Sequence, residues 1–149
     1  MSVEPSPRIR TCREGDLDDV LRIEEESFPD PYDRETFSHL LQFEPEGFLV
    51  AEGDGGIMGY ITASASYGLI FSLAVSAGRR RRRTGWMLME AVLRYLRGRT
   101  DRVSLQVRVS NSAAIGLYRQ FSFREEGRLE RYYADGESAL VMSLDFRSV

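Results

Sequence analysis

The chain of 149 residues contains no lysine, one cysteine, one histidine and no long apolar run. The single cysteine, Cys12, excludes an internal disulfide, so a reducing, cytoplasmic location is expected. The single histidine, His39, excludes sites built from several histidines, and no metal is expected. No stretch approaches the roughly 18 consecutive apolar residues that a membrane-spanning helix needs, so no membrane attachment is expected.

The charged residues are unevenly distributed along the chain. Residues 1–54 hold fifteen acidic side chains against five arginines, whereas residues 55–149 hold eight against fifteen. Two interpretations remain open: an ordinary solvated surface, or attraction of a cationic and an anionic ligand to opposite sides of one site. Apolar residues make up 42% and charged residues 29%, which excludes disordered and fibrous classes and favours one globular domain over residues 1–149.

Hydrophobic periodicity and turn residues predict the element order β-α-α-β-β-β-α-β-α-β-β, an α/β (α+β) fold with a mixed sheet. Helices are expected after Asp16, after Asp33, from Thr84 to about Arg97, and after Asn111. The two aspartates and the asparagine can each act as an N-cap. Strands are expected at 8–12, 48–51, 57–65, 69–75, 103–109, 123–133 and 139–146. Hairpin turns are expected at Asp54-Gly55-Gly56 and Ala134-Asp135-Gly136.

One acidic residue lies on the apolar face of the first predicted helix. Leu17, Val20, Leu21 and Phe28 have the i, i+3, i+4 spacing of a buried stripe, and Glu24 falls on that stripe. Burial would raise the pKa of a carboxyl, as is common at functional sites. The alternative, a structural ion pair between Glu24 and an arginine, is favoured over catalysis.

A basic loop follows the strand that ends at Val75. Five successive arginines, Arg79–Arg83, precede the helix that begins at Thr84. A helix N-terminus with added cationic side chains favours an anion such as phosphate. The glycine patterns of P-loops and dinucleotide folds are absent. On these grounds a phosphate-bearing ligand and nonspecific nucleic acid are equally compatible with the loop.

The segment LAVSAGRRRRRTGWMLME, residues 73–90, resembles motif A of the GNAT N-acetyltransferases, in which an R/Q-x-x-G-x-G/A loop binds the diphosphate of coenzyme A. Arg80 matches the first position and Gly85 the last, whereas Arg83 replaces the middle glycine. The resemblance implies the GNAT fold, a mostly antiparallel sheet with splayed central strands, and acetyl-CoA as cofactor. The residues implied to bind acetyl-CoA are Leu73, Ala74, Val75, Arg80, Arg81, Arg82, Arg83, Thr84, Gly85, Trp86, Asn111, Ala114 and Tyr118.

The second half of the chain is similar to acetyltransferases of N-terminal amino groups, including the bacterial RimI type. LQVRVSNSAAIGLYRQFSF and RYYADGESALVM, residues 105–123 and 131–142, carry this resemblance. It implies that Tyr118 is the general acid that protonates the departing thiolate, and that the Val75 backbone N–H binds the thioester carbonyl. Asn111 is implied to contact coenzyme A as well as to cap its helix.

At the position of the general base, this sequence differs from many of the proteins that it resembles. Many relatives carry glutamate where this chain has Gln106, which can hold a water molecule but cannot accept a proton at neutral pH. An α-amino group has a pKa of about 7.7–8.0, so a weak base or a water relay is sufficient. The alternative carboxylates are Asp30, Glu24 and Glu35.

The resemblance also implies a peptide entrance lined by Phe28, Pro29, Tyr32, Tyr132 and Tyr133. The expected partners are protein N-termini, with ribosomal proteins and nascent chains both open. A monomer or weak homodimer is expected. Nucleic acid is not expected, although the arginine run leaves it open.

Taken together, these residues predict an enzyme that transfers acetyl from acetyl-CoA to an N-terminal α-amino group by direct attack. Two alternatives remain: acetylation of lysine or small amines, and a catalytically weak domain that senses coenzyme A or binds RNA. Assays on free and blocked peptides discriminate between them.

Overall fold

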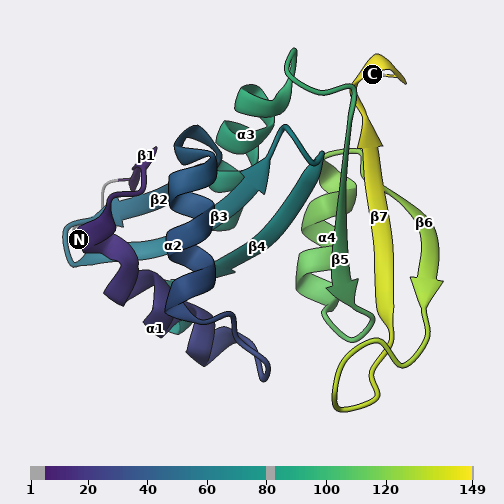
Figure 1. The fold of residues 1–149 in the computed structure, drawn as a ribbon, viewed down its shortest axis with the longest axis horizontal. Helices are drawn as coiled ribbons and strands as arrows, with labels where there is room; N and C mark the ends of the chain where they lie inside the picture. The colour runs from purple at the N-terminus through teal and green to yellow at the C-terminus, as the bar shows by residue number, and fades with distance from the viewer. Residues whose placement is uncertain (1–5, 80–82, 149) are drawn as a thin grey trace, which may run out of the picture. The chain divides into compact units, whose positions relative to one another are not determined.

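The computed structural model describes residues 6–79 and 83–148 (Figure 1). The helices and strands follow the predicted order. The chain forms two compact units, which are described separately. Unit 1 comprises Met1–Ala63 and Ser72–Tyr95, and unit 2 comprises Ser64–Phe71 and Leu96–Val149.

Unit 1 is built around its first strands and three helices. Its elements are β1 (Arg8–Thr11), α1 (Leu17–Ser27), α2 (Arg34–Phe43), β2 (Phe48–Gly53), β3 (Gly56–Ser64) and α3 (Thr84–Leu96). Short 3-10 turns lie at Glu14–Asp16, Pro45–Gly47 and Ala77–Arg79. Strand β4 (Leu69–Val75) begins in unit 2 and ends in unit 1.

Unit 2 contains the remaining elements. They are β5 (Arg102–Arg108), α4 (Ser112–Gln120), β6 (Arg124–Leu129), β7 (Ala139–Asp145) and a 3-10 turn at Phe146–Ser148. Hydrogen bonding gives the strand order β1-β2-β3-β4-β5-β7-β6. Strand β4 pairs with β5 in parallel at Leu69 and Ser104, whereas the pairs β1–β2, β2–β3, β5–β7 and β6–β7 are antiparallel. The sheet is therefore mixed and mostly antiparallel, as predicted.

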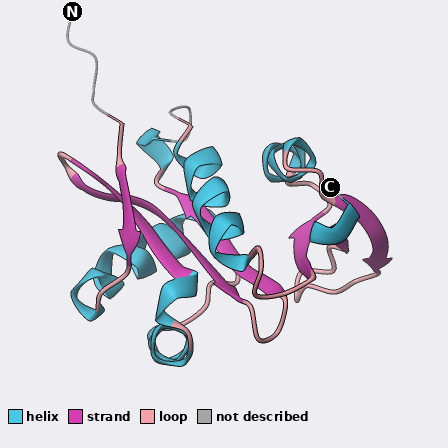
Figure 2. Cartoon of the chain, turned by 90° about the horizontal axis from the view of Figure 1, so that it is seen from above, coloured by secondary structure: helices cyan, strands magenta, loops and turns pink. Residues whose placement is uncertain are grey.

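Helices lie on both faces of the unit 1 strands (Figure 2). On one face, Val20 and Ile23 of α1 and Phe37 of α2 are fully buried with Phe48 and Tyr60. Aromatic rings organise this core, since the Phe37 centroid lies 5.6 Å from that of Tyr60 and 5.9 Å from that of Phe48.

Helix α3 approaches the other face of β3 at a glycine. A Cβ atom at Gly59 would lie 2.9 Å from the Ala74 carbonyl oxygen and 3.3 Å from the Leu88 side chain. Successive residues of a strand face opposite sides, so Gly59 faces Leu88 of α3 while Tyr60 faces α1 and α2. This glycine thus permits the close contact of β3 with β4 next to the motif A segment.

Two of the three predicted N-caps are confirmed. Asp33 accepts a hydrogen bond from Thr36 N at 2.9 Å, and Asn111 accepts one from Ala114 N at 3.2 Å. Asp16 makes no such bond to α1, so that prediction is wrong. Its carboxylate instead binds the Arg10 guanidinium at 2.7 Å, because the 3-10 turn before α1 directs it toward β1.

The core of unit 2 lies along β5 and β7. Alternate residues of β5 and most residues of β7 are buried, among them Leu105, Val107, Leu140 and Met142, and α4 contributes Ile115 and Tyr118. Strand β6, at the end of the strand order, is exposed at all six residues and carries a bulge between Glu125 and Gly127.

The predicted strand 123–133 is too long. Strand β6 ends at Leu129, and residues 130–138 form a loop. Arg131 has a φ of 50°, which strands do not tolerate, and Tyr133 N donates to Glu137 O at 3.0 Å across a turn. The predicted turn at Ala134–Gly136 lies inside this longer loop, with Gly136 at a φ of 91°.

Within the described residues, no helix combines the length and apolarity that crossing a membrane requires.

Candidate active site

Between β4 and α3, the backbone at Arg83 has the left-handed conformation that glycine adopts most readily. Arg83 has a φ of 61°, in the left-handed region, and its carbonyl accepts a hydrogen bond from Met87 N at 3.0 Å. The left-handed conformation costs a residue with a side chain roughly 1–2 kcal/mol. The Arg83 guanidinium lies 5.0 Å from the centroid of the Trp86 ring, a cation–π contact that offsets part of this cost.

The start of α3 suits an anionic group. The helix is 13 residues long, so its first N–H groups and the positive end of its dipole favour a phosphate there. The Arg83 side chain is exposed at the same point, which adds positive charge. These donors fit the diphosphate of coenzyme A. Arg80, Arg81 and Arg82, also expected there, lie outside the described residues.

The remaining predicted cofactor residues of this segment differ in burial. Leu73, Val75, Gly85 and Trp86 are half-buried, whereas Ala74 and Thr84 are buried. The Thr84 hydroxyl has no hydrogen-bond partner in the described part of the chain.

Glu24 is 2% exposed and is held by hydrogen bonds within unit 1. Its Oε1 accepts from the Tyr60 hydroxyl and from Ser72 Oγ, the latter at 2.8 Å, and its Oε2 accepts from Tyr32 N at 3.0 Å. The hydroxyls of Tyr60 and Ser72 are themselves 2.9 Å apart. Burial, followed by the charge of Glu24, raises the pKa of Tyr60, which keeps that hydroxyl protonated as a donor. The expected arginine partner of Glu24 is thus replaced by two hydroxyls and a backbone amide.

Glu24 also anchors the segment predicted to line the peptide entrance. Its bond to Tyr32 N fixes the end of residues 28–32, and the Tyr32 ring meets the buried Phe37 ring edge-on at 5.9 Å. Phe28 packs against the same core. Pro29 and Asp30 are exposed, so they can meet a substrate.

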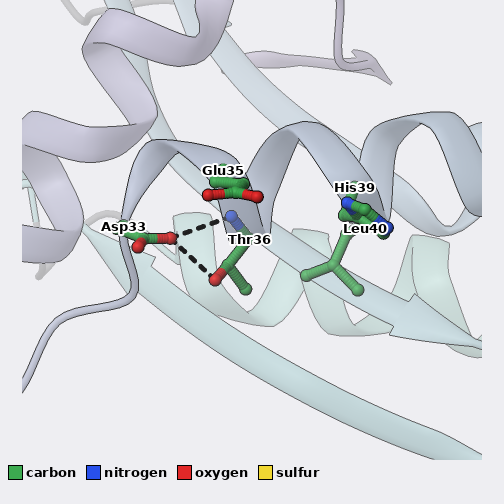
Figure 3. Close-up of a pocket in the computed structure, with 5 residues that line it drawn as sticks. All are labelled: Asp33, Glu35, Thr36, His39 and Leu40. Atoms are coloured by element: carbon green, nitrogen blue, oxygen red, sulfur yellow. Dashed lines mark hydrogen bonds between the residues drawn. The ribbon is translucent and has the colours of Figure 1, made fainter.

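A cavity of about 330 Å³ opens beside α2 (Figure 3). It is lined by Asp33, Glu35, Thr36, His39 and Leu40. The Asp33 carboxylate is engaged with the Thr36 amide and hydroxyl, at 2.9 and 2.8 Å. Sequence analysis named Glu35 only as an alternative base and gave His39 no role.

Tyr118 of α4 is a buried titratable residue of unit 2. It is 6% exposed, and burial, followed by the nearby Tyr133, raises its pKa. Its ring lies 5.9 Å from that of Phe123, and among the described residues its hydroxyl makes no hydrogen bond. A protonated hydroxyl with no protein acceptor can donate a proton to a bound group. Asn111 caps this helix, and the half-buried Ala114 supplies the capped N–H.

Gln106 lies on the open face of β5. Its side chain is exposed while Leu105 and Val107 are buried, and it is paired with Val141 of β7. Because an amide cannot take up a proton at neutral pH, this position can orient a water molecule or a substrate but cannot serve as a base.

The loop 130–138 presents the two tyrosines predicted to contact the peptide. Tyr132 is 50% exposed, and its ring lies 5.0 Å from that of Tyr133 in an edge-on arrangement. The Arg108 guanidinium lies over the Tyr133 ring at 4.0 Å. No role is predicted for Arg108 from the sequence, and its position in the VRVSN segment, two residues after Gln106, is the signal that points to it.

Comparison with known proteins supports the resemblance to acetyltransferases. Residues 17–123 match the Acetyltransferase (GNAT) family model, which spans more than half of the chain. The chain therefore belongs to the GNAT family of acetyltransferases.

Within that family the chain is related to archaeal and bacterial enzymes. It is 35% identical to the N-alpha-acetyltransferase of Sulfurisphaera tokodaii over 153 residues, covering 91% of both chains. It is 35% identical over 139 residues to the putative [ribosomal protein bS18]-alanine N-acetyltransferase of Bacillus subtilis, covering 90% of this chain and 92% of the relative. The crystal structure of Ard1 from Thermoplasma volcanium superimposes with a TM-score of 0.89 at 30% identity, covering 95% of this chain and 98% of that one.

Proposed function

We propose that this chain transfers the acetyl group of acetyl-CoA to the α-amino group at the N-terminus of a peptide or protein. It is an acetyl-CoA-dependent N-alpha-acetyltransferase of the GNAT family. The observation that carries this conclusion is similarity at 30–35% identity to archaeal N-alpha-acetyltransferases over about nine-tenths of the chain.

Tyr118 is the proton donor in this proposal. Acetyl-CoA supplies a thioester, whose C–S bond breaks as the amine nitrogen forms the new C–N bond. The Tyr118 hydroxyl donates its proton to the departing sulfur, because a thiol leaves more readily than a thiolate. The newly bonded nitrogen loses one proton to water, and water returns one to Tyr118, so that the products are the amide and coenzyme A as its thiol. Burial keeps that proton on Tyr118 throughout the neutral range. The Val75 N–H is the group that we assign to the thioester oxygen, by the resemblance.

The start of α3 and the substrate loops position the two reactants in this proposal. The N–H groups at the beginning of α3, together with Arg83, bind the diphosphate of coenzyme A. By the resemblance, we assign peptide contacts to residues 28–32 in unit 1 and to Tyr132 and Tyr133 in unit 2.

The substrate α-amino group loses its proton at neutral pH without a strong base. An α-amino group titrates at about 7.7–8.0, so an appreciable fraction is neutral at physiological pH. Both oxygens of Glu24 accept hydrogen bonds, which favours an anchoring role for this carboxylate over a catalytic one. Gln106 and Asp30, both exposed, orient the amine or its water.

The substrate protein is a further proposal. The Bacillus subtilis relative is named a putative [ribosomal protein bS18]-alanine N-acetyltransferase. We therefore propose ribosomal proteins and nascent chains with small first residues as substrates.

The test is thiol release from acetyl-CoA with peptides that begin Ser, Ala, Met-Leu and Met-Glu. Each is assayed beside an N-terminally blocked twin that contains lysine. Turnover restricted to free N-termini is the expected result. Turnover of the blocked twins would reassign the enzyme to lysine acetylation. No turnover, with coenzyme A binding measured by calorimetry, would leave a binding domain.

A further inference from the structure

Arg108, at the end of β5, makes more contacts than an ordinary strand arginine. Its side chain is 12% exposed, and its Nη1 donates to Asp135 Oδ2 at 2.9 Å and to Glu137 Oε1 at 2.8 Å. The guanidinium carbon also lies 4.0 Å from the centroid of the Tyr133 ring. All three partners belong to loop 130–138. One side chain thus contacts this loop at three points.

The loop is folded around these contacts. Glu137 Oε2 accepts from Ser110 N at 2.9 Å, and Glu137 N donates to Asp135 Oδ1 at 3.0 Å. The Glu137 carbonyl accepts from Tyr133 N at 3.0 Å. Hydrogen bonds from Ser110 and Arg108 lower the pKa of Glu137, so it is ionised at neutral pH. The guanidinium therefore binds two carboxylates through Nη1 while its plane lies over one aromatic ring.

We propose that Arg108 is a positioning residue for the peptide substrate, fixing loop 130–138 and the Tyr133 ring against which the first residues of the peptide bind. The inference rests on the proposed function. It assigns no proton transfer to Arg108, which acts through Tyr133.

Physical differences between arginine and lysine make the proposal specific. A lysine at position 108 keeps the charge and can still pair with a carboxylate, but it lacks the planar guanidinium that lies over the Tyr133 ring. Without Arg108 both carboxylates keep a backbone donor, Ser110 N for Glu137 and Glu137 N for Asp135, and both stay partly exposed, so neither becomes a buried, unpartnered charge. The main expected effect of removing Arg108 is therefore on the geometry of the loop and not on global stability.

The test compares Arg108→Gln and Arg108→Lys with the wild-type chain and with Arg124→Gln, an exposed arginine of β6 in the same unit. We expect Arg108→Gln to raise the peptide KM about tenfold and Arg108→Lys to raise it by an intermediate factor. The KM for acetyl-CoA and the urea midpoint should change little. Arg124→Gln should match the wild type in both KM values.

Hydrogen exchange supplies a readout that does not depend on turnover. Amides of residues 130–138 should exchange faster in Arg108→Gln than in the wild type, with α4 unaffected. Unchanged exchange, or equal effects on both KM values, would overturn the role of Arg108. Absence of wild-type turnover would instead refute the proposed function, and the exchange result would still decide whether Arg108 holds the loop.

Discussion

Unit 1 and unit 2 each bury one titratable side chain that sequence analysis considered for catalysis, and the two differ in how they are satisfied. Both oxygens of Glu24 accept hydrogen bonds, from two hydroxyls and one backbone amide. The Tyr118 hydroxyl has no hydrogen-bond partner among the described residues. Burial alone therefore does not distinguish an anchor from a reactive group, whereas the hydrogen-bond inventory does.

The difference also explains why the two side chains should respond differently to substitution. Removing Glu24 takes the acceptor from a buried hydroxyl pair, in which only one hydroxyl can then donate to the other, and this costs stability. Removing the Tyr118 hydroxyl takes a hydrogen-bond partner from no group in residues 6–79 and 83–148, so the loss should appear in turnover.

The largest effect is expected for Tyr118→Phe. General acid catalysis contributes about 10²–10⁴-fold, so kcat should fall by at least about a hundredfold, while the free energy of unfolding changes by less than about 1 kcal/mol. Steady-state kinetics and urea unfolding measure the two quantities. Tyr67→Phe, at a 66% exposed tyrosine of unit 2, is the matched control and should behave as the wild type. A fully active Tyr118→Phe variant would remove the proposed acid.

The pH profile provides a second readout for Tyr118. A general acid works while it is protonated, and the raised pKa of Tyr118 moves its deprotonation above the ordinary tyrosine value of about 10. The wild-type kcat should therefore show no alkaline decline up to pH 10. A decline centred near pH 8 would identify a different acid.

A smaller effect, on stability, is expected for Glu24→Ala. The Tyr60 and Ser72 hydroxyls and the Tyr32 amide lose their shared acceptor, so the free energy of unfolding should fall by about 2–4 kcal/mol. Glu24→Gln, which keeps one acceptor oxygen, should lose about half as much. Urea unfolding measures both variants. Glu25→Ala, at the exposed neighbouring residue, should change by less than about 0.5 kcal/mol.

Turnover of the Glu24 variants tests whether Glu24 is an anchor or a catalytic base. If Glu24→Gln folds normally but loses a hundredfold in kcat with an unchanged peptide KM, Glu24 is a base and the anchoring role is wrong.

The smallest effect is expected at the strained residue of the motif A segment. Arg83→Gly and Arg83→Ala both remove the contact with Trp86, but only glycine relieves the left-handed conformation. The relief of roughly 1–2 kcal/mol is partly offset by the greater chain entropy that glycine loses on folding, so the glycine variant should be more stable than the alanine variant by about 0.5–1 kcal/mol in urea unfolding. The same pair of substitutions at Arg131, which has a φ of 50° in unit 2, should give a difference of the same sign. Equal stabilities would mean that the strain is absent in solution.

The fold was predicted well because its helices, strands and caps are determined by residues that lie close together in the sequence. The element order and the caps at Asp33 and Asn111 follow from periodicity and from side chains next to their own helices. The N-cap prediction for Asp16 is wrong because the Arg10 guanidinium binds its carboxylate. The strand was extended through Tyr132 and Tyr133 because aromatic residues favour strands, whereas contacts with Arg108 fold this segment into a loop.

The site was less predictable because its contacts join distant parts of the chain. Periodicity placed Glu24 correctly on a buried face, but its hydroxyl partners lie 36 and 48 residues further along. No spacing rule identifies such a pair. The contacts of Arg108 could not be predicted for the same reason, since its partners Asp135 and Glu137 lie 27 and 29 residues away in the sequence.

The exposed strand β6 has a consequence for how the protein behaves at high concentration. A strand at the end of a sheet offers unpaired backbone groups that can pair with another copy and seed fibrous aggregates. Four of the six residues of β6 are charged, and the bulge after Glu125 interrupts its regular ladder. Charges and bulges are the features with which natural sheets resist such growth. The sequence of β6 therefore lets the molecule keep an uncovered sheet edge without polymerising through it.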